Sequence, residues 1–217
     1  MLLKRLFMNN IEDKSHFKQG SLFLLRHADR PPIPEGSFGN ELAITHQGRE
    51  KSTSLGQRIG SNLYSIHSSP VLRCMETTQY IISGSNKTVP ITEDKMLGNP
   101  GAFISNASVA EKNWERFGHE KVCKKLLFHD QPMEGFYPPK KAAMRLLTHM
   151  MLHRPPKGFT TLFITHDIII AAIAVRLFNL TDYKKIWPDF LDGLKVETCK
   201  HKISIQFYKY MSNPMIE

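Results

Sequence analysis

The sequence has few cysteines, and it lacks a hydrophobic run long enough to span a bilayer. Its three cysteines, Cys74, Cys123 and Cys199, are far apart, and no two of them form a Cys-x-x-Cys pair. An odd number of widely spaced cysteines argues against a secreted disulfide framework and against a zinc site, and it favours a reducing, cytoplasmic compartment. The longest apolar stretch, residues 168–178, is about half of what a bilayer requires and predicts a buried helix, so we expect no membrane partner. The basic and apolar residues 1–8 are too short for the core of a signal peptide.

The sequence also lacks a concentrated basic stripe, although its net charge is positive. It has 29 Lys and Arg against 20 Asp and Glu, which gives a net charge of +9 with neutral histidines. Because the basic residues are scattered and not interleaved with aromatic side chains, we expect no nucleic-acid partner. The excess suits an anionic partner of some kind. With 217 residues, 41% of them hydrophobic, and no repeat, the chain predicts a single domain over residues 1–217.

Short apolar runs typical of strands alternate with segments of helical spacing. Strands are predicted at residues 21–25, 64–67, 89–92 and 161–165, and helices at 47–62, 70–82, 139–153 and 168–177. This order predicts an α/β fold, a three-layer α/β/α sandwich with a mostly parallel central sheet. Alternating segments at 194–198 and 202–210 predict an antiparallel hairpin at one edge. The less regular stretch 95–138, with helical segments at 111–117 and 121–128, predicts a small cap-like insertion over the strand ends.

Three short motifs lie where a predicted strand ends and the chain turns away from the sheet. They read RHADRPP after the first strand, SSPVLR after the second and THD after the fourth. Ligands bind at this edge of open α/β sheets. The motifs bring two arginines, two histidines and an aspartate to that edge, namely Arg26, His27, Arg73, His166 and Asp167. Together the arginines and histidines make a cationic pocket that matches a phosphate in charge and geometry.

Each motif has a simpler interpretation when it is taken alone. An Arg26-His27 dipeptide is more often part of a basic loop, and Arg73 could be an ordinary solvated side chain. Asp167 could be the N-cap of the following helix, and His166 a satisfied histidine at the end of a core strand. None of these interpretations accounts for all three motifs together.

In combination the motifs resemble those of the histidine phosphatase superfamily, whose signature is an Arg-His-Gly after the first strand, an arginine after the second and a late histidine. The resemblance runs from about residue 21 to residue 167, and the Leu-Asp-Gly at 191–193 is also family-like. It implies His27 as the nucleophile, with the phosphoryl oxygens held by Arg26, Arg73 and His166. An imidazole nucleophile forms a phosphohistidine, and fixed cations stabilise the charge of the transferring group. No metal or other cofactor is expected.

Two branches of this superfamily differ in the residue that protonates the leaving group. The acid-phosphatase and phytase branch extends the first motif to Arg-His-Gly-x-Arg-x-Pro and places an aspartate directly after the late histidine. Arg30 and Pro32 fit the extended motif, and Asp167 follows His166. The resemblance therefore favours this branch, with Asp167 as the acid and Arg30 as a further phosphate ligand.

In the mutase-like branch the acid is a glutamate after the third strand. Asn99 occupies that position here, and an amide cannot donate the proton. Glu93 and Asp94 remain alternative acids. The first motif has Ala28 where the family has glycine, which adds a methyl group where the backbone could approach a ligand.

The sequence thus predicts a metal-independent phosphomonoesterase acting on a small phosphorylated substrate. A non-catalytic module that binds phosphorylated ligands is the alternative from another class, with Ala28 as its best support. Among enzymes, a phosphoglycerate mutase-like or phosphohistidine-protein phosphatase activity is also compatible. Trp114, Trp187, Phe103 and Phe136 are predicted to pack in the core, although those within residues 95–138 could also form a wall of the pocket.

Overall fold

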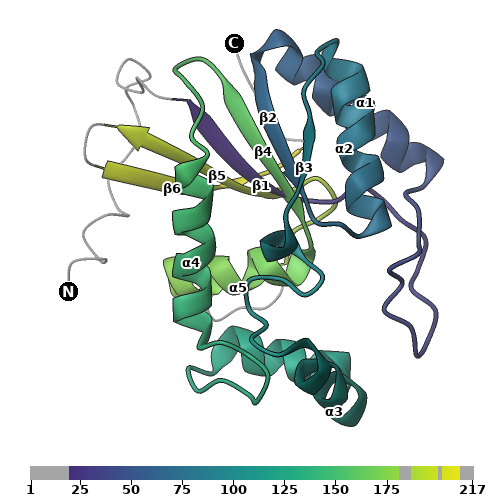
Figure 1. The fold of residues 1–217 in the computed structure, drawn as a ribbon, viewed down its shortest axis with the longest axis vertical. Coiled ribbons are helices and arrows are strands. Elements are labelled where there is room, and N and C mark those ends of the chain that lie inside the picture. Colours follow the sequence, from purple (N-terminus) through teal and green to yellow (C-terminus); the bar gives the residue numbers. More distant parts are fainter. Residues whose placement is uncertain (1–19, 181–186, 200–201, 211–217) are drawn as a thin grey trace.

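A six-stranded mixed sheet forms the centre of the protein, whose computed structural model describes residues 20–180, 187–199 and 202–210 (Figure 1). The strands are β1 (Ser21–Arg26), β2 (Leu63–Ser68), β3 (Ile91–Glu93), β4 (Thr160–Thr165), β5 (Gly193–Cys199) and β6 (Lys202–Tyr208), in the order β3-β2-β4-β1-β5-β6. The first four are parallel, and β5 and β6 form an antiparallel hairpin beside β1. The predicted sheet is confirmed. The N-terminal residues 1–8, on which the expectation about export rests, lie outside the described residues.

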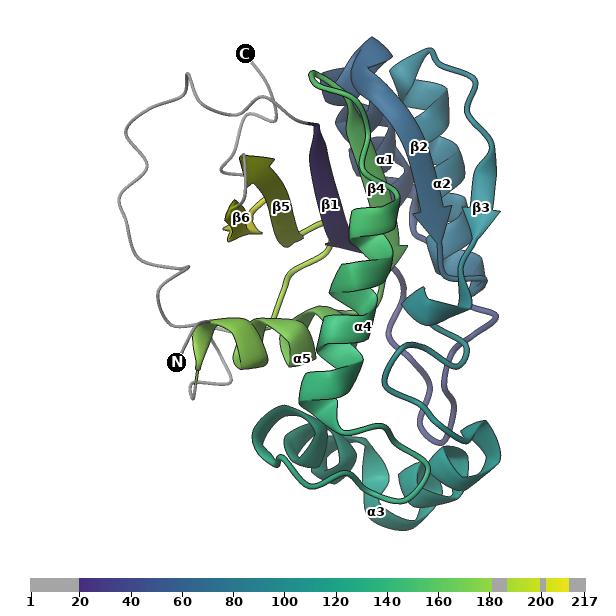
Figure 2. The ribbon, with the colours of Figure 1, turned by 60° about the vertical axis from the view of Figure 1, so that its left-hand side comes forward.

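Helices cover both faces of the sheet, and one further helix lies beyond the strand ends. The helices are α1 (His46–Ile59), α2 (Leu72–Ser85), α3 (Ala107–Phe128), α4 (Pro139–Leu152) and α5 (Asp167–Phe178), with short 3₁₀ turns η3 (Gly60–Asn62) and η4 (Lys95–Leu97). Helices α1 and α2 lie together on one side of the sheet, and α4 and α5 on the other (Figure 1). Helix α3 lies past the carboxyl ends of the parallel strands (Figure 2).

Strand β1 shows why the parallel strands are apolar throughout. Leu22 and Leu24 pack into the cluster under α4 and α5, whereas Phe23 and Leu25 pack into the cluster under α1 and α2. Successive side chains of a strand point to opposite faces, and both faces of this sheet are covered by helices. The continuous apolar run therefore follows from burial on both sides.

Two glycines allow α1 and α2 to lie in close contact. A Cβ atom at Gly56 would collide with the carbonyl oxygen of Ile81, and one at Gly84 would collide with that of Thr53. Neither glycine is needed for its backbone conformation, since both lie inside helices. The pair holds α2 firmly against α1, and α2 carries Arg73 in its first turn.

Several boundaries differ from those predicted, among them the end of α1, the range of β3 and the start of α2. Helix α2 begins at Leu72 and not at Pro70, because Val71 is extended and donates its N–H to Ser69 Oγ. The two helical segments expected in residues 95–138 form the single element α3, interrupted at Gly118, whose φ of 74° is not helical.

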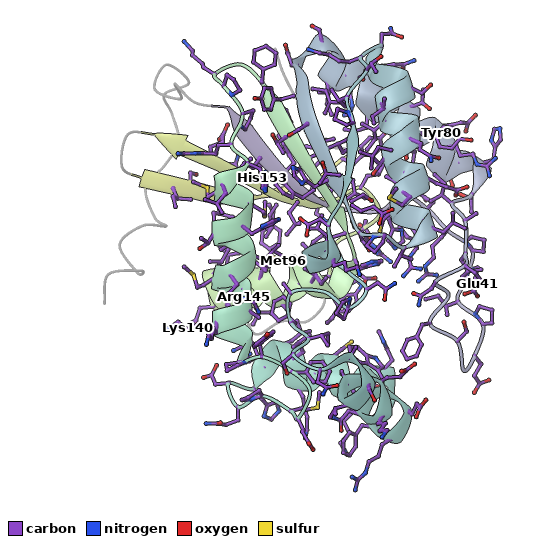
Figure 3. All side chains as sticks on the ribbon, in the orientation of Figure 1. Glu41, Tyr80, Met96, Lys140, Arg145 and His153 are labelled. Carbon is purple, nitrogen blue, oxygen red and sulfur yellow. The ribbon has the colours of Figure 1, made fainter. Side chains whose placement is uncertain are left out.

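Helix α4 shows the amphipathic pattern that predicted it. Ala142, Leu146 and Met150 are buried, whereas Lys140 and Arg145 are exposed (Figure 3). The predicted apolar helix is α5, which is buried over most of its length. Within the described ranges, none of the helices has the length and hydrophobicity needed to cross a membrane.

Candidate active site

The register of the parallel strands brings the three motifs to one place. Arg26 pairs with Thr165, and Ser68 pairs with Ile164, so the residues that follow these strands emerge side by side. The backbone N–H of His27 still donates to the Thr165 carbonyl at 2.9 Å. The convergence expected from the strand ends is therefore present.

His27 is buried, with only 2% of its surface exposed. Its Nδ1 lies 2.8 Å from the carbonyl oxygen of Ala28, so Nδ1 carries the proton and donates it to that oxygen. Nε2 is then unprotonated, and its lone pair accepts a hydrogen bond from Arg73 Nε at 3.1 Å. Burial, followed by the neighbouring His166, holds the pKa of His27 well below its usual value. The imidazole is therefore neutral and has its unprotonated nitrogen toward the arginine.

Arg73 joins the two histidines. Besides His27 it donates through Nη2 to His166 Nδ1 at 3.3 Å and through Nη1 to the Gly39 carbonyl at 2.6 Å. Burial lowers its pKa from that of a free guanidinium, yet the group remains charged at neutral pH. A cation in the first turn of a helix opposes the helix dipole, and these contacts explain why Arg73 lies there.

His166 is held from both ring nitrogens. Its Nδ1 accepts from Arg73, so Nε2 carries the proton and donates to Ser69 Oγ at 3.0 Å. Burial and then Arg73 lower its pKa to about 3, which leaves the ring neutral. The ring centroids of His27 and His166 are 5.6 Å apart. A Cβ at Gly98 would lie 2.5 Å from His166 Nε2, so only glycine fits beside this ring.

Asp167 is the first residue of α5, and its carboxylate is paired with Arg26. The distance from Asp167 Oδ2 to Arg26 Nη2 is 2.8 Å, and Oδ1 accepts from the N–H of Ile168 at 2.8 Å. The N-cap position belongs to His166, so the capping interpretation of Asp167 does not hold. Arg26 also donates to the Pro188 carbonyl at 2.9 Å and lies over the ring of Phe190, 4.1 Å from its centroid.

Arg30 lies near the same groups, and Ala28 does not face them. Arg30 lines the cavity with its Nη1 on the Pro31 carbonyl, and burial together with Arg73 and Arg26 lowers its pKa. Ala28 is fully buried in the core under α1 and α2, and its N–H donates to Thr77 Oγ1 at 3.0 Å. The methyl group that replaces the family's glycine therefore points into the core.

The alternative acids lie elsewhere. Asp94 is buried with Oδ2 2.6 Å from His149 Nε2, while Oδ1 accepts from the N–H of Met96. Glu93 is exposed, and neither carboxylate lines the cavity. Asn99 does line it. Among the described residues that form the cavity wall, Asp167 is the only carboxylate.

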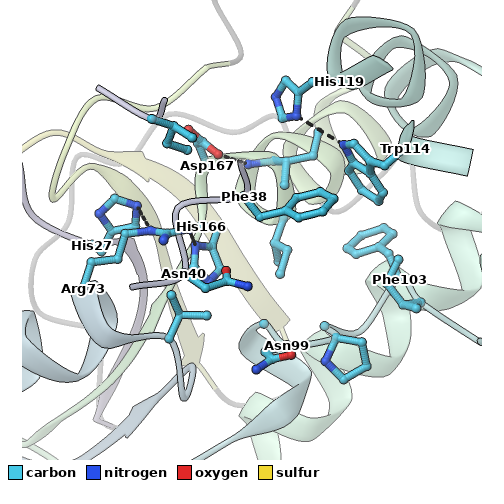
Figure 4. A pocket seen from close by; sticks show the side chains of 18 of the residues that line it. His27, Phe38, Asn40, Arg73, Asn99, Phe103, Trp114, His119, His166 and Asp167 are labelled. Carbon is cyan, nitrogen blue, oxygen red and sulfur yellow. Dashed lines mark hydrogen bonds between the residues drawn. The ribbon is translucent and has the colours of Figure 1, made fainter. Parts of the chain in front are cut away.

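One end of a cavity of about 300 Å³ is formed by His27, Arg30, Arg73, His166 and Asp167 (Figure 4), whereas Arg26 lies behind Asp167 and does not line it. Its other walls come from the loop after β1 and from residues 95–138, neither of which the motifs identified. They include Ile33, Ser37, Phe38 and Asn40 from the loop, and Phe103, Ile104, Trp114, His119 and Leu126 from the insertion. Phe103 and Trp114 thus serve both packing and the pocket wall. No sequence signal marked Phe38 or Asn40, because a loop side chain follows no periodicity.

One family model matches most of the chain, including all three motifs. The model of the histidine phosphatase superfamily, branch 1, matches residues 22–188. The chain belongs to the histidine phosphatase superfamily. The matching model is that of branch 1, so the acid-phosphatase and phytase branch favoured by the extended motif is not supported. Pro32, which suggested that branch, is an exposed loop residue. No match was found among curated proteins.

Solved structures of the superfamily share the fold at low sequence identity. A phosphoserine phosphatase mutant from Entamoeba histolytica, in complex with phosphoserine, has a TM-score of 0.61 at 18% identity, covering 91% of this chain and 100% of that one. A mycobacterial glucosyl-3-phosphoglycerate phosphatase has a TM-score of 0.57 at 15% identity, covering 87% and 96%. Phosphoglycerate mutase from Bacillus anthracis str. Sterne has a TM-score of 0.57 at 14% identity, covering 90% and 95%.

The described residues include no group of three or more His, Cys, Asp and Glu side chains arranged to hold a metal ion. Cys74 and Cys123 are free and buried, and burial raises the pKa of each thiol to about 12. Cys74 lies 3.7 Å from His166 Nε2, where a neutral thiol packs against the ring.

Proposed function

We propose that this member of the superfamily hydrolyses phosphate monoesters through a phosphohistidine on His27. One observation carries the proposal: His27 Nε2 is unprotonated and lies in a cavity with a guanidinium 3.1 Å away. A neutral imidazole with its other nitrogen fixed on a backbone carbonyl is prepared to attack phosphorus.

The charge of the site supports a dianionic phosphoryl group. Arg26, Arg30 and Arg73 are opposed by the single carboxylate of Asp167, and both imidazoles are neutral. The excess of two positive charges complements a phosphate monoester dianion. Fixed cations of this kind stabilise the charge spread over the equatorial oxygens during transfer. His166 adds a neutral contact to the same group.

In the first step the N–H of Arg73 Nε turns from His27 Nε2 to a phosphoryl oxygen, and Nε2 forms a bond to phosphorus while the bond from phosphorus to the ester oxygen breaks. The departing oxygen takes a proton from Asp167, and the proton on Nδ1 of His27 stays on that nitrogen, hydrogen-bonded to the Ala28 carbonyl. In the second step water attacks phosphorus, Asp167 takes its proton, and the bond between phosphorus and Nε2 breaks. Phosphate leaves, and His27 returns to its neutral form.

Asp167 can take part in these steps because of its position between Arg26 and the cavity. In the proposed cycle the leaving group takes a proton from Asp167, and the attacking water returns one to it.

The experiment that tests the function measures phosphate release and the phosphoenzyme together. With p-nitrophenyl phosphate in excess chelator, we expect continuous turnover and, after rapid quenching at alkaline pH, a phosphorylated peptide containing His27 in the mass spectrum. Turnover that stops in chelator would show that the reaction needs a metal. Tight vanadate binding without any turnover or phosphopeptide would instead identify a non-catalytic module that binds phosphorylated ligands.

The role of Asp167 predicts a dependence on the leaving group. In Asp167→Asn, kcat/KM for ethyl phosphate should fall about 100-fold, because ethoxide needs a proton to leave. The value for p-nitrophenyl phosphate should fall less than about fivefold, because nitrophenolate leaves without one. Asp189→Asn, which changes an exposed aspartate outside the cavity, is the matched control. Equal losses with both esters would assign the proton to another group.

The domain organisation that goes with this function is also a proposal. We infer a single domain over residues 1–217 in which residues 95–138 act as a small cap. The cap helix α3 lies past the strand ends and contributes Trp114, His119 and Leu126 to the cavity wall. The two buried free thiols suit a reducing, cytoplasmic compartment.

A further inference from the structure

The cavity has its charged groups at one end only. Among the described residues that line it, the charged side chains are Arg30, Arg73 and Asp167, all at the end formed by the motifs. Away from that end the wall is mainly apolar, and Asn40, Asn99 and His119 are its larger polar members. The basic residues that give the chain its net charge therefore do not extend along the cavity.

We propose that the alcohol portion of the substrate is apolar and planar, carries no second acidic group, and is held between Phe38 and Trp114. This inference rests on the hydrolase function proposed above. It concerns the part of the substrate that leaves, and so it goes beyond the phosphoryl chemistry.

Trp114 forms a fixed aromatic wall on the cap side. Its indole Nε1 donates to His119 Nδ1 at 3.3 Å, and the ring packs on Phe136 with centroids 5.4 Å apart. Because Nδ1 accepts, His119 Nε2 carries the proton, which points to Cys123 Sγ at 3.4 Å. The polar atoms of both rings are thus used within the protein. What they offer a ligand is mainly apolar ring surface.

Phe38 forms the facing wall, on the loop after β1. Figure 4 shows its ring in the space between His166 and Trp114. The residue is 46% exposed, which is a large apolar surface for a side chain next to a buried site. Its neighbour Gly39 accepts a 2.6 Å hydrogen bond from Arg73, which ties the loop to the phosphate end of the cavity. A planar group between the two rings would cover the exposed face of Phe38.

The same wall disfavours an acidic leaving group. A carboxylate or second phosphate would lose its hydration on entering the apolar part, and no cation of the described lining is there to replace the water. Phosphoglycerates, although related proteins are named for them, should therefore be poor substrates of this chain.

The test compares three esters of primary alcohols that differ in the group beyond the reacting carbon: 2-(2-naphthyl)ethyl phosphate, ethyl phosphate and 3-phosphoglycerate. For the wild type we expect kcat/KM to be about 100-fold higher for the naphthylethyl ester than for ethyl phosphate, from burial of the ring system. We expect 3-phosphoglycerate to react no faster than ethyl phosphate. Phe38→Ala and Trp114→Ala should each reduce the 100-fold preference to about tenfold or less.

Two features of the design separate the possible failures. Phe38 is half exposed, so Phe38→Ala should fold even if Trp114→Ala does not, and Phe128→Ala changes a part-exposed aromatic of α3 outside the cavity and should keep the preference. Equal kcat/KM for the naphthylethyl and ethyl esters, with turnover lost in His27→Ala, would overturn this inference and leave the hydrolase function in place. If no ester is turned over, the hydrolase proposal fails. Calorimetric titration of the intact esters then tests the inferred preference for an apolar, planar alcohol portion. Binding of the naphthylethyl ester about 100-fold tighter than that of ethyl phosphate would support this preference, and equal binding would overturn it.

Discussion

Replacing His27 with alanine should lower kcat for phosphate monoesters by about 10⁴-fold or more. In the proposed mechanism the imidazole of His27 supplies the atom that bonds to phosphorus, and no other group at the site has that role. His166 is the nearest imidazole, and its proposed role is to contact the phosphoryl group while it is held by Arg73 and Ser69. The loss should therefore be in kcat for good and poor leaving groups alike.

Steady-state rates with p-nitrophenyl phosphate and ethyl phosphate check this result. His46→Ala is the matched control, because His46 is an exposed histidine at the start of α1, whereas His27 is buried. It should retain wild-type rates. Equal rates for His27→Ala and the wild type would refute the phosphohistidine mechanism.

Replacing Arg73 should have the second largest effect. Arg73→Met removes a guanidinium that contacts His27, His166 and the Gly39 carbonyl at once, and we expect kcat/KM to fall about 10³-fold. Arg73→Lys should recover less than tenfold of that loss, because an ammonium is a point charge that cannot make the three contacts in one plane. Part of the effect is loss of the cation, and part is loss of the orientation of two rings.

The measurements are kcat/KM and the inhibition constant of vanadate in both variants. Arg145→Met is the control, because Arg145 is an exposed arginine of α4 that lies over Tyr137 and outside the cavity. Vanadate inhibition should weaken in parallel with kcat/KM in Arg73→Met. A lysine variant with wild-type rates would show that charge alone is needed and that the bridge between the histidines is not.

The central fold was predictable because its signals are local and repeated. Strands buried on both faces are continuous apolar runs, and the alternation with helices such as 139–153 leaves few topologies. The boundaries were less predictable. Val71 is extended and delays α2 by two residues, and the helical halves of α3 meet at Gly118, because tertiary contacts and single backbone angles decide such details.

The convergence of the motif residues at one end of the candidate site was predictable for a related reason. His27 and His166 follow parallel strands directly, so the sheet register alone brings them together. Phe38 comes from a loop and Trp114 from α3, and the placement of both depends on packing that sequence spacing does not show. The pairing of Asp94 with His149 could not be foreseen either, because Asp94 lies at the start of η4 and His149 lies on α4.

The preference between branches shows the limit of short motifs. Arg30 and Pro32 matched the extended pattern of one branch, while the family model of the other matches residues 22–188. In the structure Pro32 has no part in the cavity, and only Arg30 reaches it. A few loop residues can coincide with a pattern, whereas a match that spans the four parallel strands cannot easily do so.

Arg26 is held by hydrogen bonds with the segment that leads into the C-terminal hairpin. Its side chain donates to the Pro188 carbonyl, its backbone N–H donates to Asp192, and its carbonyl accepts from Leu191. The guanidinium fixed in this way is the partner of Asp167. A protein shortened to residue 180 would display all three signature motifs intact and yet lack the brace for its proposed acid, so the working unit is longer than the signature that reveals it.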